Sequence, residues 1–296
     1  MPINFRAYLT LTRPPNIITS MADVIAATCI ACTVAQMHLT DNIIEILCLA
    51  FASCFLYAGG VVMNDVADIS IDKIERPERP IPAKLVSKTG ATIWALLLSA
   101  TAIVLASWVS IVSAILAILI VIASYVYDFY GKHYAIGPIN MGLCRALNFS
   151  MGLSISLQVL QSYWWLSLIA VVYIAAITMI SKGEVSGGNQ SAIRNAAIMF
   201  GFVIGVLAFI AITQQTHFYA ALFFVALFTF YLYKPLIMAY QQPQPALIRK
   251  AVKAGVIGII LLDACLLAAF MGLLPALFLC ALLPISLIIA KIFAVT

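Results

Sequence analysis

The sequence predicts an all-α fold: a bundle of transmembrane helices forming one integral-membrane domain over residues 1–296. Of the 296 residues, 64% are apolar and only 9% are charged, whereas a soluble domain carries about 25% charged residues. The mean hydropathy is +1.10. The apolar residues form continuous runs rather than the alternating pattern of a membrane β-barrel. This composition excludes a soluble enzyme, a disordered chain and a nucleic-acid-binding module, so no nucleic-acid partner is expected and the surrounding lipids are the expected environment.

Ten apolar stretches reach or approach the roughly 20 residues that a helix needs to cross a bilayer. The third and fourth are separated only by the region of Trp108 and should form a tight helical hairpin. The ten stretches cover residues 17–36, 43–64, 90–107, 110–127, 138–159, 163–180, 192–213, 217–238, 250–271 and 275–293.

The basic residues all fall on one side of the predicted bundle, with the single exception of Arg145. Every other Lys and Arg lies at a terminus or beside the gap that follows an even-numbered span. The positive-inside rule assigns that side to the cytoplasm. We therefore expect a multi-pass protein of the cell (inner) membrane with both termini, and most of its acidic side chains, on the cytoplasmic face.

A cluster of acidic residues ends the second span. Asp65, Asp68 and Asp72 follow the spacing i, i+3 and i+7, which places them on one face of a helix. Two carboxylates about 6 Å apart repel by roughly 3 kcal/mol at an effective dielectric constant of 20. Mg²⁺, which takes one or two carboxylates plus substrate phosphates, would offset this repulsion, and Arg76 and Arg79 could bind a phosphate. A merely solvated helix end would explain the charge but not its position at the lipid boundary.

The same segment resembles a known motif. The pattern in 64–72, Asn-Asp-x-x-Asp-x-x-x-Asp, with Arg-Pro-x-Arg-Pro-Ile-Pro in 76–82, is similar to the first aspartate-rich motif of the UbiA superfamily of membrane prenyltransferases. The Arg-Pro-Pro-Asn sequence at 13–16 is also similar, and within the superfamily the chain most resembles the EboC-like branch. The resemblance implies a nine-helix bundle around a central cavity, to which the tenth stretch would be an addition. It also implies that Mg²⁺ and the diphosphate of an isoprenoid donor are bound by Asn64, Asp65, Asp68 and Asp72.

The segment after the sixth span departs from the pattern of the family. Relatives usually carry a second aspartate-rich motif there, whereas residues 181–190 contain one carboxylate, Glu184, and no aspartate. Glu184 and Asn189 could complete a metal site. A glycine-rich connecting loop without a ligand is the alternative.

Two further groups of polar residues are candidates for the site. Tyr127, Asp128 and Lys132 end the fourth span. Family members often have a tyrosine and a lysine there near the diphosphate, although an aromatic belt with an anchoring lysine would look the same. Arg145, with Asn148 three residues on, is the only basic residue well inside a span. It should face a diphosphate or an acidic partner, or form a purely structural ion pair.

Polar residues also occur in the first and ninth spans. Asn16 and Asp23 are seven residues apart and can face the same side of one helix. Asp263 should lie near the membrane midplane, about 20 Å along the helix from Arg249. The sequence indicates no partner for it.

The acidic cluster predicts a site for Mg²⁺ and a phosphate, and the resemblance implies a Mg²⁺-dependent enzyme that transfers an isoprenyl group from a prenyl diphosphate to an aromatic or other small lipophilic acceptor. The predicted catalytic residues are Asp65, Asp68, Lys132 and Arg145. The predicted substrate-binding residues are Asn16, Asn64, Arg76, Arg79, Tyr127, Asp128, Asn148 and Asn189. The predicted metal ligands are Asp65, Asp68, Asp72 and Glu184. The alternative is a membrane protein of the same fold that binds or moves an isoprenoid or pathway intermediate without turnover.

Overall fold

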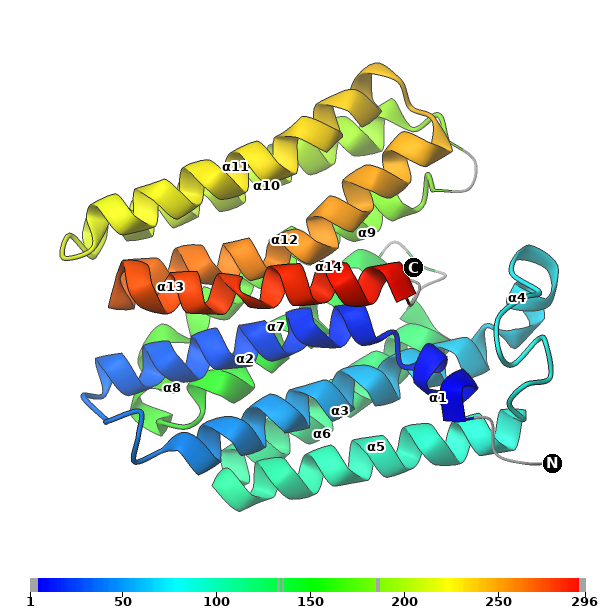
Figure 1. Ribbon diagram of the computed structural model, residues 1–296, viewed down its shortest axis with the longest axis horizontal. Helices are drawn as coiled ribbons and strands as arrows, with labels where there is room; N and C mark the ends of the chain where they lie inside the picture. Colours follow the sequence, from blue (N-terminus) through cyan, green and yellow to red (C-terminus); the bar gives the residue numbers. More distant parts are fainter. Residues whose placement is uncertain (1–4, 132–133, 135, 185–186, 293–296) are drawn as a thin grey trace.

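The computed structural model describes residues 5–131, 134, 136–184 and 187–292, and all regular structure within these ranges is helical. The α-helices share a common bundle and are joined mostly by short connections (Figure 1). They are α1 (Phe5–Leu11), α2 (Pro14–Val34), α3 (Ile43–Ala67), α4 (Ile69–Glu75), α5 (Lys88–Val109), α6 (Ile111–Phe129), α7 (Gly137–Leu153), α8 (Leu157–Tyr163), α9 (Ser167–Ser181), α10 (Gln190–Thr213), α11 (Phe218–Gln241), α12 (Pro245–Met271), α13 (Leu273–Cys280) and α14 (Leu282–Ile292). A 3₁₀ turn, Trp164–Leu166, joins α8 to α9.

The predicted transmembrane bundle is confirmed. Within the described residues, nine helical segments are long and apolar enough to cross a membrane. All ten predicted stretches are helical, but α7 has only 17 residues and falls short of that length. The last stretch divides at Ala281 into α13 and α14. The α14 helix packs on α2, where the buried Ser286 hydroxyl donates to the carbonyl oxygen of Pro15 at 3.0 Å.

The helix α12 is the centre of the bundle. It is buried along most of its length and packs against α2, α9 and α11. A helix that is apolar on all sides is expected to be buried in this way. The outer helices instead expose large apolar side chains, such as Trp108, Phe209 and Phe278, on the surface that lipid would cover.

The hairpin predicted near Trp108 is also confirmed. Ser110 is the only residue between α5 and α6, and its backbone is extended. Its side chain accepts a hydrogen bond from the backbone N–H of Ser113 at 3.0 Å. This serine cap satisfies one of the open N–H groups at the start of α6 and lets the chain reverse within one residue.

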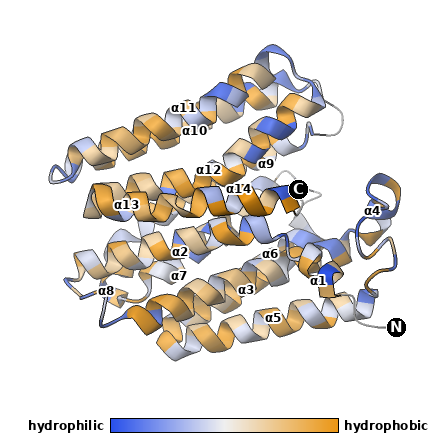
Figure 2. Ribbon diagram, viewed as in Figure 1, coloured by the Kyte–Doolittle hydropathy of each residue, from blue (hydrophilic) through white to orange (hydrophobic). Residues whose placement is uncertain are grey.

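The end of the bundle that carries α4 is its polar end. Figure 2 shows hydrophilic residues gathered on α4 and on the nearby ends of α11 and α12, while the middle of the bundle is hydrophobic. The loop between α4 and α5 is held in place because Ile81 and Val86 are buried against α1, α3 and α5. Charged side chains are therefore concentrated at one mouth of an apolar bundle.

Candidate functional site

A cavity of about 600 Å³ opens among the helices near α4, and we call it the central cavity. This volume lies within the usual range for small-molecule sites. Its polar end is lined by Arg13, Asn16, Asn64, Asp68, Asp72, Glu75, Arg76, Arg79, Tyr127, Asp128 and Glu184. Its interior wall includes apolar side chains from the middle of α3, α6, α9 and α12, among them Leu56, Ile120, Ile174, Ile177, Val256 and Ile259. The cavity thus combines a charged mouth with an apolar interior.

The three aspartates of the first motif do not lie on one uninterrupted helix. The α3 helix ends at Ala67 and α4 begins at Ile69, so Asp68 forms the junction between them. Asp68 and Asp72 line the central cavity, whereas Asp65 does not. The spacing on an ideal helix predicted a shared face, but the break at Asp68 gives the carboxylates different surroundings.

Asp65 is held by two arginines. Its Oδ1 atom accepts hydrogen bonds from Nη2 of Arg13 at 2.7 Å and from Nη1 of Arg79 at 3.1 Å. The same Nη1 atom of Arg79 contacts Oδ2 of Asp72 at 2.8 Å. Charge-assisted hydrogen bonds of this kind fix the direction of a guanidinium group. Asp65 therefore orients Arg13 and Arg79 at the cavity mouth. Asp72 contacts Arg79 and also lines the cavity.

Sequence reasoning did not assign Arg13 to the site. Its backbone is in the left-handed region, with φ 47°, directly before the two prolines that start α2. Non-glycine residues in this conformation are uncommon, and those that exist cluster at functional sites. The signal available in the sequence was the charged residue next to Pro14 at the entry to a span.

The end of α6 faces the first motif across the cavity. Nδ2 of Asn64 donates a hydrogen bond to Oδ1 of Asp128 at 2.8 Å, and both residues line the central cavity together with Tyr127. This contact brings together residues 64 positions apart, as the predicted site requires. Lys132, also predicted for this site, lies outside the described residues.

The segment after α9 reaches the same cavity through one carboxylate. Glu184 is 7% exposed and lines the central cavity, and its Oε1 atom has no hydrogen-bond partner among the described residues. Burial raises the pKa of Glu184 above its usual value, and the nearby Arg76 and Arg249 offset only part of that effect. An unpaired buried carboxyl group facing a cavity is suited to a ligand that supplies positive charge.

Asn189 has a different place from the one predicted. It is exposed, it does not line the central cavity, and its Oδ1 atom accepts a hydrogen bond from the N–H of Ala192 at 3.0 Å. It is the N-cap of α10. Asparagine is among the preferred residues for this role because its side chain satisfies an open backbone N–H group.

The donor set at the mouth suits Mg²⁺ bound together with a phosphate. Asp68, Asp72, Asp128 and Glu184 offer carboxylate oxygens, and Asn64 adds an amide oxygen. These are the hard oxygen ligands that Mg²⁺ prefers. In the part of the chain that the structure describes, no three such acidic, His or Cys side chains are grouped closely enough to hold an ion alone. Substrate oxygens would therefore have to complete the coordination, which is the usual arrangement for Mg²⁺.

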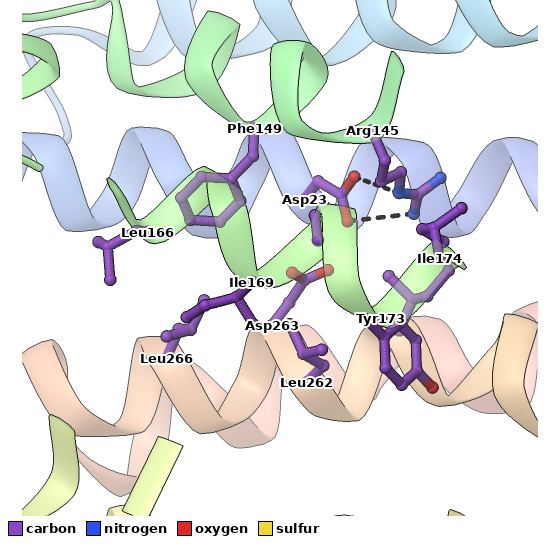
Figure 3. A pocket seen from close by; sticks show the side chains of 12 residues that line it. Asp23, Arg145, Phe149, Leu166, Ile169, Tyr173, Ile174, Leu262, Asp263 and Leu266 are labelled. Carbon is purple, nitrogen blue, oxygen red and sulfur yellow. Dashed lines mark hydrogen bonds and ion pairs between the residues drawn. The ribbon is translucent and has the colours of Figure 1, made fainter. Parts of the chain in front are cut away.

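A second polar cluster lies deeper, where the central cavity meets a void of about 10 Å³ (Figure 3). Arg145 on α7 pairs with Asp23 on α2 through its Nε atom, and its Nη2 atom contacts Oδ1 of Asp23 at 3.1 Å. Asn148 donates from Nδ2 to Oδ2 of Asp23 at 3.1 Å. Asp263 on α12 points toward Asp23 from the opposite side. Arg145 is therefore acid-paired, and Asp23 is the neighbour of Asp263 that the sequence did not indicate.

Comparison with known proteins gives a consistent result. The model of the UbiA prenyltransferase family matches residues 24–185. A digeranylgeranylglyceryl phosphate synthase of Thermococcus kodakarensis is 32% identical over 126 residues, which are 42% of this chain and 43% of that protein. The synthase of the same name from Sulfurisphaera tokodaii is 28% identical over 206 residues, which are 67% of this chain and 71% of that protein. The match to the Thermococcus protein thus spans less than half of its length.

Two solved structures share the fold. A UbiA homolog from Aeropyrum pernix K1 aligns with a TM-score of 0.70 and 15% identity, over 84% of this chain and 96% of that one. A UbiA homolog from Archaeoglobus fulgidus bound to GPP and Mg²⁺ aligns with a TM-score of 0.64 and 13% identity, over 88% of this chain and 99% of that one. At these identities the likeness concerns the fold alone.

Proposed function

The chain belongs to the UbiA prenyltransferase family, and we propose that it transfers an isoprenyl group from a prenyl diphosphate to a lipophilic acceptor within the membrane. The observation that carries this proposal is the central cavity, where the first motif and the segment after α9 meet. Asp68 and Glu184 are 116 positions apart in the sequence, and both line the central cavity. A charged mouth above an apolar interior fits a ligand with a phosphorylated head and a hydrocarbon tail.

Mg²⁺ is the cofactor of the proposed reaction. Asp68, Asp72, Asp128 and Glu184, with Asn64, would hold it together with the donor's diphosphate. When bound, Mg²⁺ neutralises the negative charge that develops on the departing pyrophosphate. The structural neighbour from Archaeoglobus fulgidus is bound to GPP and Mg²⁺, which supports Mg²⁺ as the cofactor.

The arginines at the mouth bind the donor's phosphate oxygens in this proposal. Arg13 and Arg79 are oriented by Asp65, and Arg76 lines the cavity near Glu184. Each guanidinium carries five N–H donors, so the existing contacts of Arg79 leave donors for a phosphate. Asn16, Tyr127 and Lys132 complete the proposed donor site, Lys132 on sequence grounds only. Asp65 acts here through the arginines that it positions.

The proposed transfer breaks the bond between the donor's first carbon and the diphosphate oxygen. A new bond forms between that carbon and the nucleophilic atom of the acceptor, and pyrophosphate leaves with the bonding electron pair. The acceptor loses one proton, which passes to the pyrophosphate or to water at the mouth. The apolar wall of the cavity keeps water away from the reacting carbon, which protects an allylic cation from hydrolysis.

The two related synthases support a lipophilic acceptor, because they are named for a glycerol phosphate that carries isoprenoid chains. The distribution of Lys and Arg supports a cytoplasmic mouth, in a protein of the cell membrane with both termini on that side. We propose the whole of residues 1–296 as one catalytic domain, since α12 and α14 pack on helices of the matched region.

One observation favours a second candidate function, in which the protein binds or moves an isoprenoid without turnover. The segment after α9 supplies one carboxylate, Glu184, to the cavity, where the resemblance to the family implies a second aspartate-rich motif. With fewer ligands, the metal would stabilise the leaving group less.

The distinguishing experiment measures pyrophosphate release by the purified protein from geranyl or geranylgeranyl diphosphate in the presence of a panel of lipid alcohols and phenols. We expect release that requires Mg²⁺ and falls at least about 100-fold in Asp68→Asn. Glu78→Gln is the matched control, because Glu78 is an exposed carboxylate on the neighbouring loop that does not line the cavity. Tight Mg²⁺-dependent donor binding without release, for every acceptor, would favour the second function.

A further inference from the structure

Arg145 is fixed in the middle of the bundle by groups from α2. Asp23 pairs with its Nε and Nη2 atoms, and Nη2 also donates to the backbone carbonyl of Thr19. Arg145 is 8% exposed and Asp23 is 3% exposed. A bidentate pairing of this kind removes most of the rotational freedom of the guanidinium group. One side of Arg145 is therefore occupied permanently by the protein.

Asp263 adds a second carboxyl group to the same cluster. It is 1% exposed and points toward Asp23, and its Oδ2 atom has no hydrogen-bond partner among the described residues. The adjoining void of about 10 Å³ is at the lower limit for a single water molecule, so bulk solvent does not hydrate the pair. The guanidinium of Arg145 is therefore paired with the carboxylate of Asp23 inside the protein.

The opposite side of this cluster faces the central cavity with one donor and one acceptor. Arg145 and Asn148, three residues apart on α7, both line that cavity. The Nδ2 atom of Asn148 faces two oxygens, Oδ2 of Asp23 and the carbonyl of Ser20 at 3.0 Å, which fixes the orientation of the amide. The Oδ1 atom of Asn148 therefore points away from Asp23 and Ser20. Among the described residues, Oδ1 of Asn148 receives no hydrogen bond and Nη1 of Arg145 donates none.

We propose that Arg145 and Asn148 form a deep subsite of the central cavity that binds an uncharged hydroxyl group of the acceptor. A hydroxyl accepts one hydrogen bond and donates another, so it matches Nη1 of Arg145 and Oδ1 of Asn148 together. An anionic group fits less well, because Asp23 already balances the charge of Arg145 and the other cavity arginines lie at the mouth. The proposal rests on the proposed function only in identifying the ligand as the acceptor.

Two properties of the subsite make it selective. It lies about 12 Å along α7 from the start of that helix, since Arg145 is eight residues after Gly137. Apolar residues such as Ile174 and Ile259 line the cavity beside it. A ligand without a hydroxyl would leave the donor and the acceptor unpaired in an apolar surrounding, which is unfavourable. The subsite therefore selects alcohols and phenols over ethers of the same shape.

The test measures equilibrium binding of two probes to the purified protein in lipid nanodiscs by isothermal titration calorimetry. The probes are 1-O-octylglycerol and the same molecule with both hydroxyls methylated. We expect the alcohol to bind at least about tenfold more tightly than the methylated probe. In Arg145→Lys, which keeps a cation beside Asp23 but loses the guanidinium donor facing the cavity, this preference should fall to less than about threefold.

Thr178→Val is the matched control. Thr178 lines the central cavity, but its hydroxyl donates to the carbonyl of Ile174 at 2.8 Å and does not contact the subsite. It should keep the full preference for the alcohol. Equal binding of the two probes to the unaltered protein, absence of alcohol binding, or an unchanged preference in Arg145→Lys would each overturn the proposal.

Donor binding is measured on the same samples with geranyl diphosphate and Mg²⁺. Because Arg145 is held away from the mouth by Asp23, Arg145→Lys should change the dissociation constant of the donor by less than about threefold. If the unaltered protein prefers the alcohol but does not bind the donor, the proposed function fails and the subsite stands. If it binds the donor but does not prefer the alcohol, only the subsite fails.

Discussion

Asp65 accepts a 2.7 Å hydrogen bond from Arg13, 52 positions earlier in the chain, and this contact joins the entry of α2 to the end of α3. The same carboxylate oxygen accepts from Arg79. Asp65, which the sequence predicts to be a metal ligand, is therefore the counter-charge of two arginines. Its substitution should have different effects from the substitution of Asp68.

Replacing Asp65 by Asn should lower the free energy of unfolding by about 2 kcal/mol, because two partly buried guanidinium groups lose their shared counter-charge. The donor KM should rise, while the Mg²⁺ concentration for half-maximal activity should change by less than about threefold. Asp68→Asn should have the opposite profile: the Mg²⁺ concentration for half-maximal activity should rise, and stability should change little. Chemical unfolding and Mg²⁺ titrations of both variants compare the two residues. Equal Mg²⁺ defects would mean that Asp65 is a direct ligand.

The carboxyl of Glu184 predicts a pH dependence of stability in the metal-free protein. Burial raises the pKa of Glu184 above the ordinary value of 4.5. The folded state then holds this proton more tightly than the unfolded chain, so the contribution is present below about pH 4.5 and is lost as the pH rises through the raised pKa. Glu184→Gln, which mimics the protonated group, should be more stable than the unaltered protein at pH 7 and equal to it near about pH 4.

Thermal unfolding in a chelator between these pH values measures the effect. Glu78→Gln is again the control, because the exposed Glu78 should give no pH-dependent difference. A constant difference between Glu184→Gln and the unaltered protein at every pH would contradict the prediction.

The pair Asp23 and Asp263 predicts strongly non-additive substitutions. Asp263→Asn leaves the pairing of Arg145 with Asp23 intact and should cost less than about 1 kcal/mol. In Asp23→Asn, Asp263 can ionise and take over as the counter-charge of Arg145, so the protein should still fold. The double variant leaves Arg145 without a carboxylate and should lose a further 3 kcal/mol or more, about the cost of an unpaired buried charge.

Chemical unfolding of the two single variants and the double variant measures this coupling. Additive stability effects would contradict it, because they would mean that Asp263 does not replace Asp23 as the counter-charge of Arg145.

Close packing of α7 on α2 sets the geometry of the deep cluster. A Cβ atom at Gly152 would lie 2.6 Å from Cβ of Ala27 and 2.9 Å from the carbonyl oxygen of Val24. Gly152→Ala should therefore push α7 from α2 and separate Arg145 from Asp23, with a cost of about 1–3 kcal/mol. Gly205→Ala is the contrast, because nothing lies within 4 Å of a Cβ there.

Gly205→Ala should leave stability unchanged or raise it by up to about 1 kcal/mol, since alanine favours the helix. Thermal unfolding and alcohol binding are measured for both variants. Equal stability of the two proteins would show that the contact between α7 and α2 yields without cost.

Periodicity and composition predicted the fold well because a membrane imposes long apolar segments that are visible locally in the sequence. All ten predicted stretches are helical, and the serine-capped hairpin at Ser110 lies where the short gap placed it. The length of α7 and the division of the last stretch at Ala281 were not visible, because apolar composition continues through both boundaries.

The site was predicted in part. Residue chemistry and resemblance identified Asp68, Asp72 and Glu184, which the structure brings to one cavity. The roles of Asp65 and Arg13 depend on a contact across 52 residues, and Asp263 approaches Asp23 because α12 packs on α2. Pairings of this kind are set by tertiary packing, which no local pattern in a single sequence records.

The central claim is that the cavity mouth binds Mg²⁺ and a prenyl diphosphate together through carboxylates from both motifs. The most direct test is a calorimetric titration of geranyl diphosphate into the purified protein, with Mg²⁺ and with a chelator, for the unaltered chain, Asp68→Asn and Glu184→Gln. We predict binding that requires Mg²⁺ and weakens at least about tenfold in each variant. Binding that is equally strong in the chelator, or unchanged in both variants, would contradict the account.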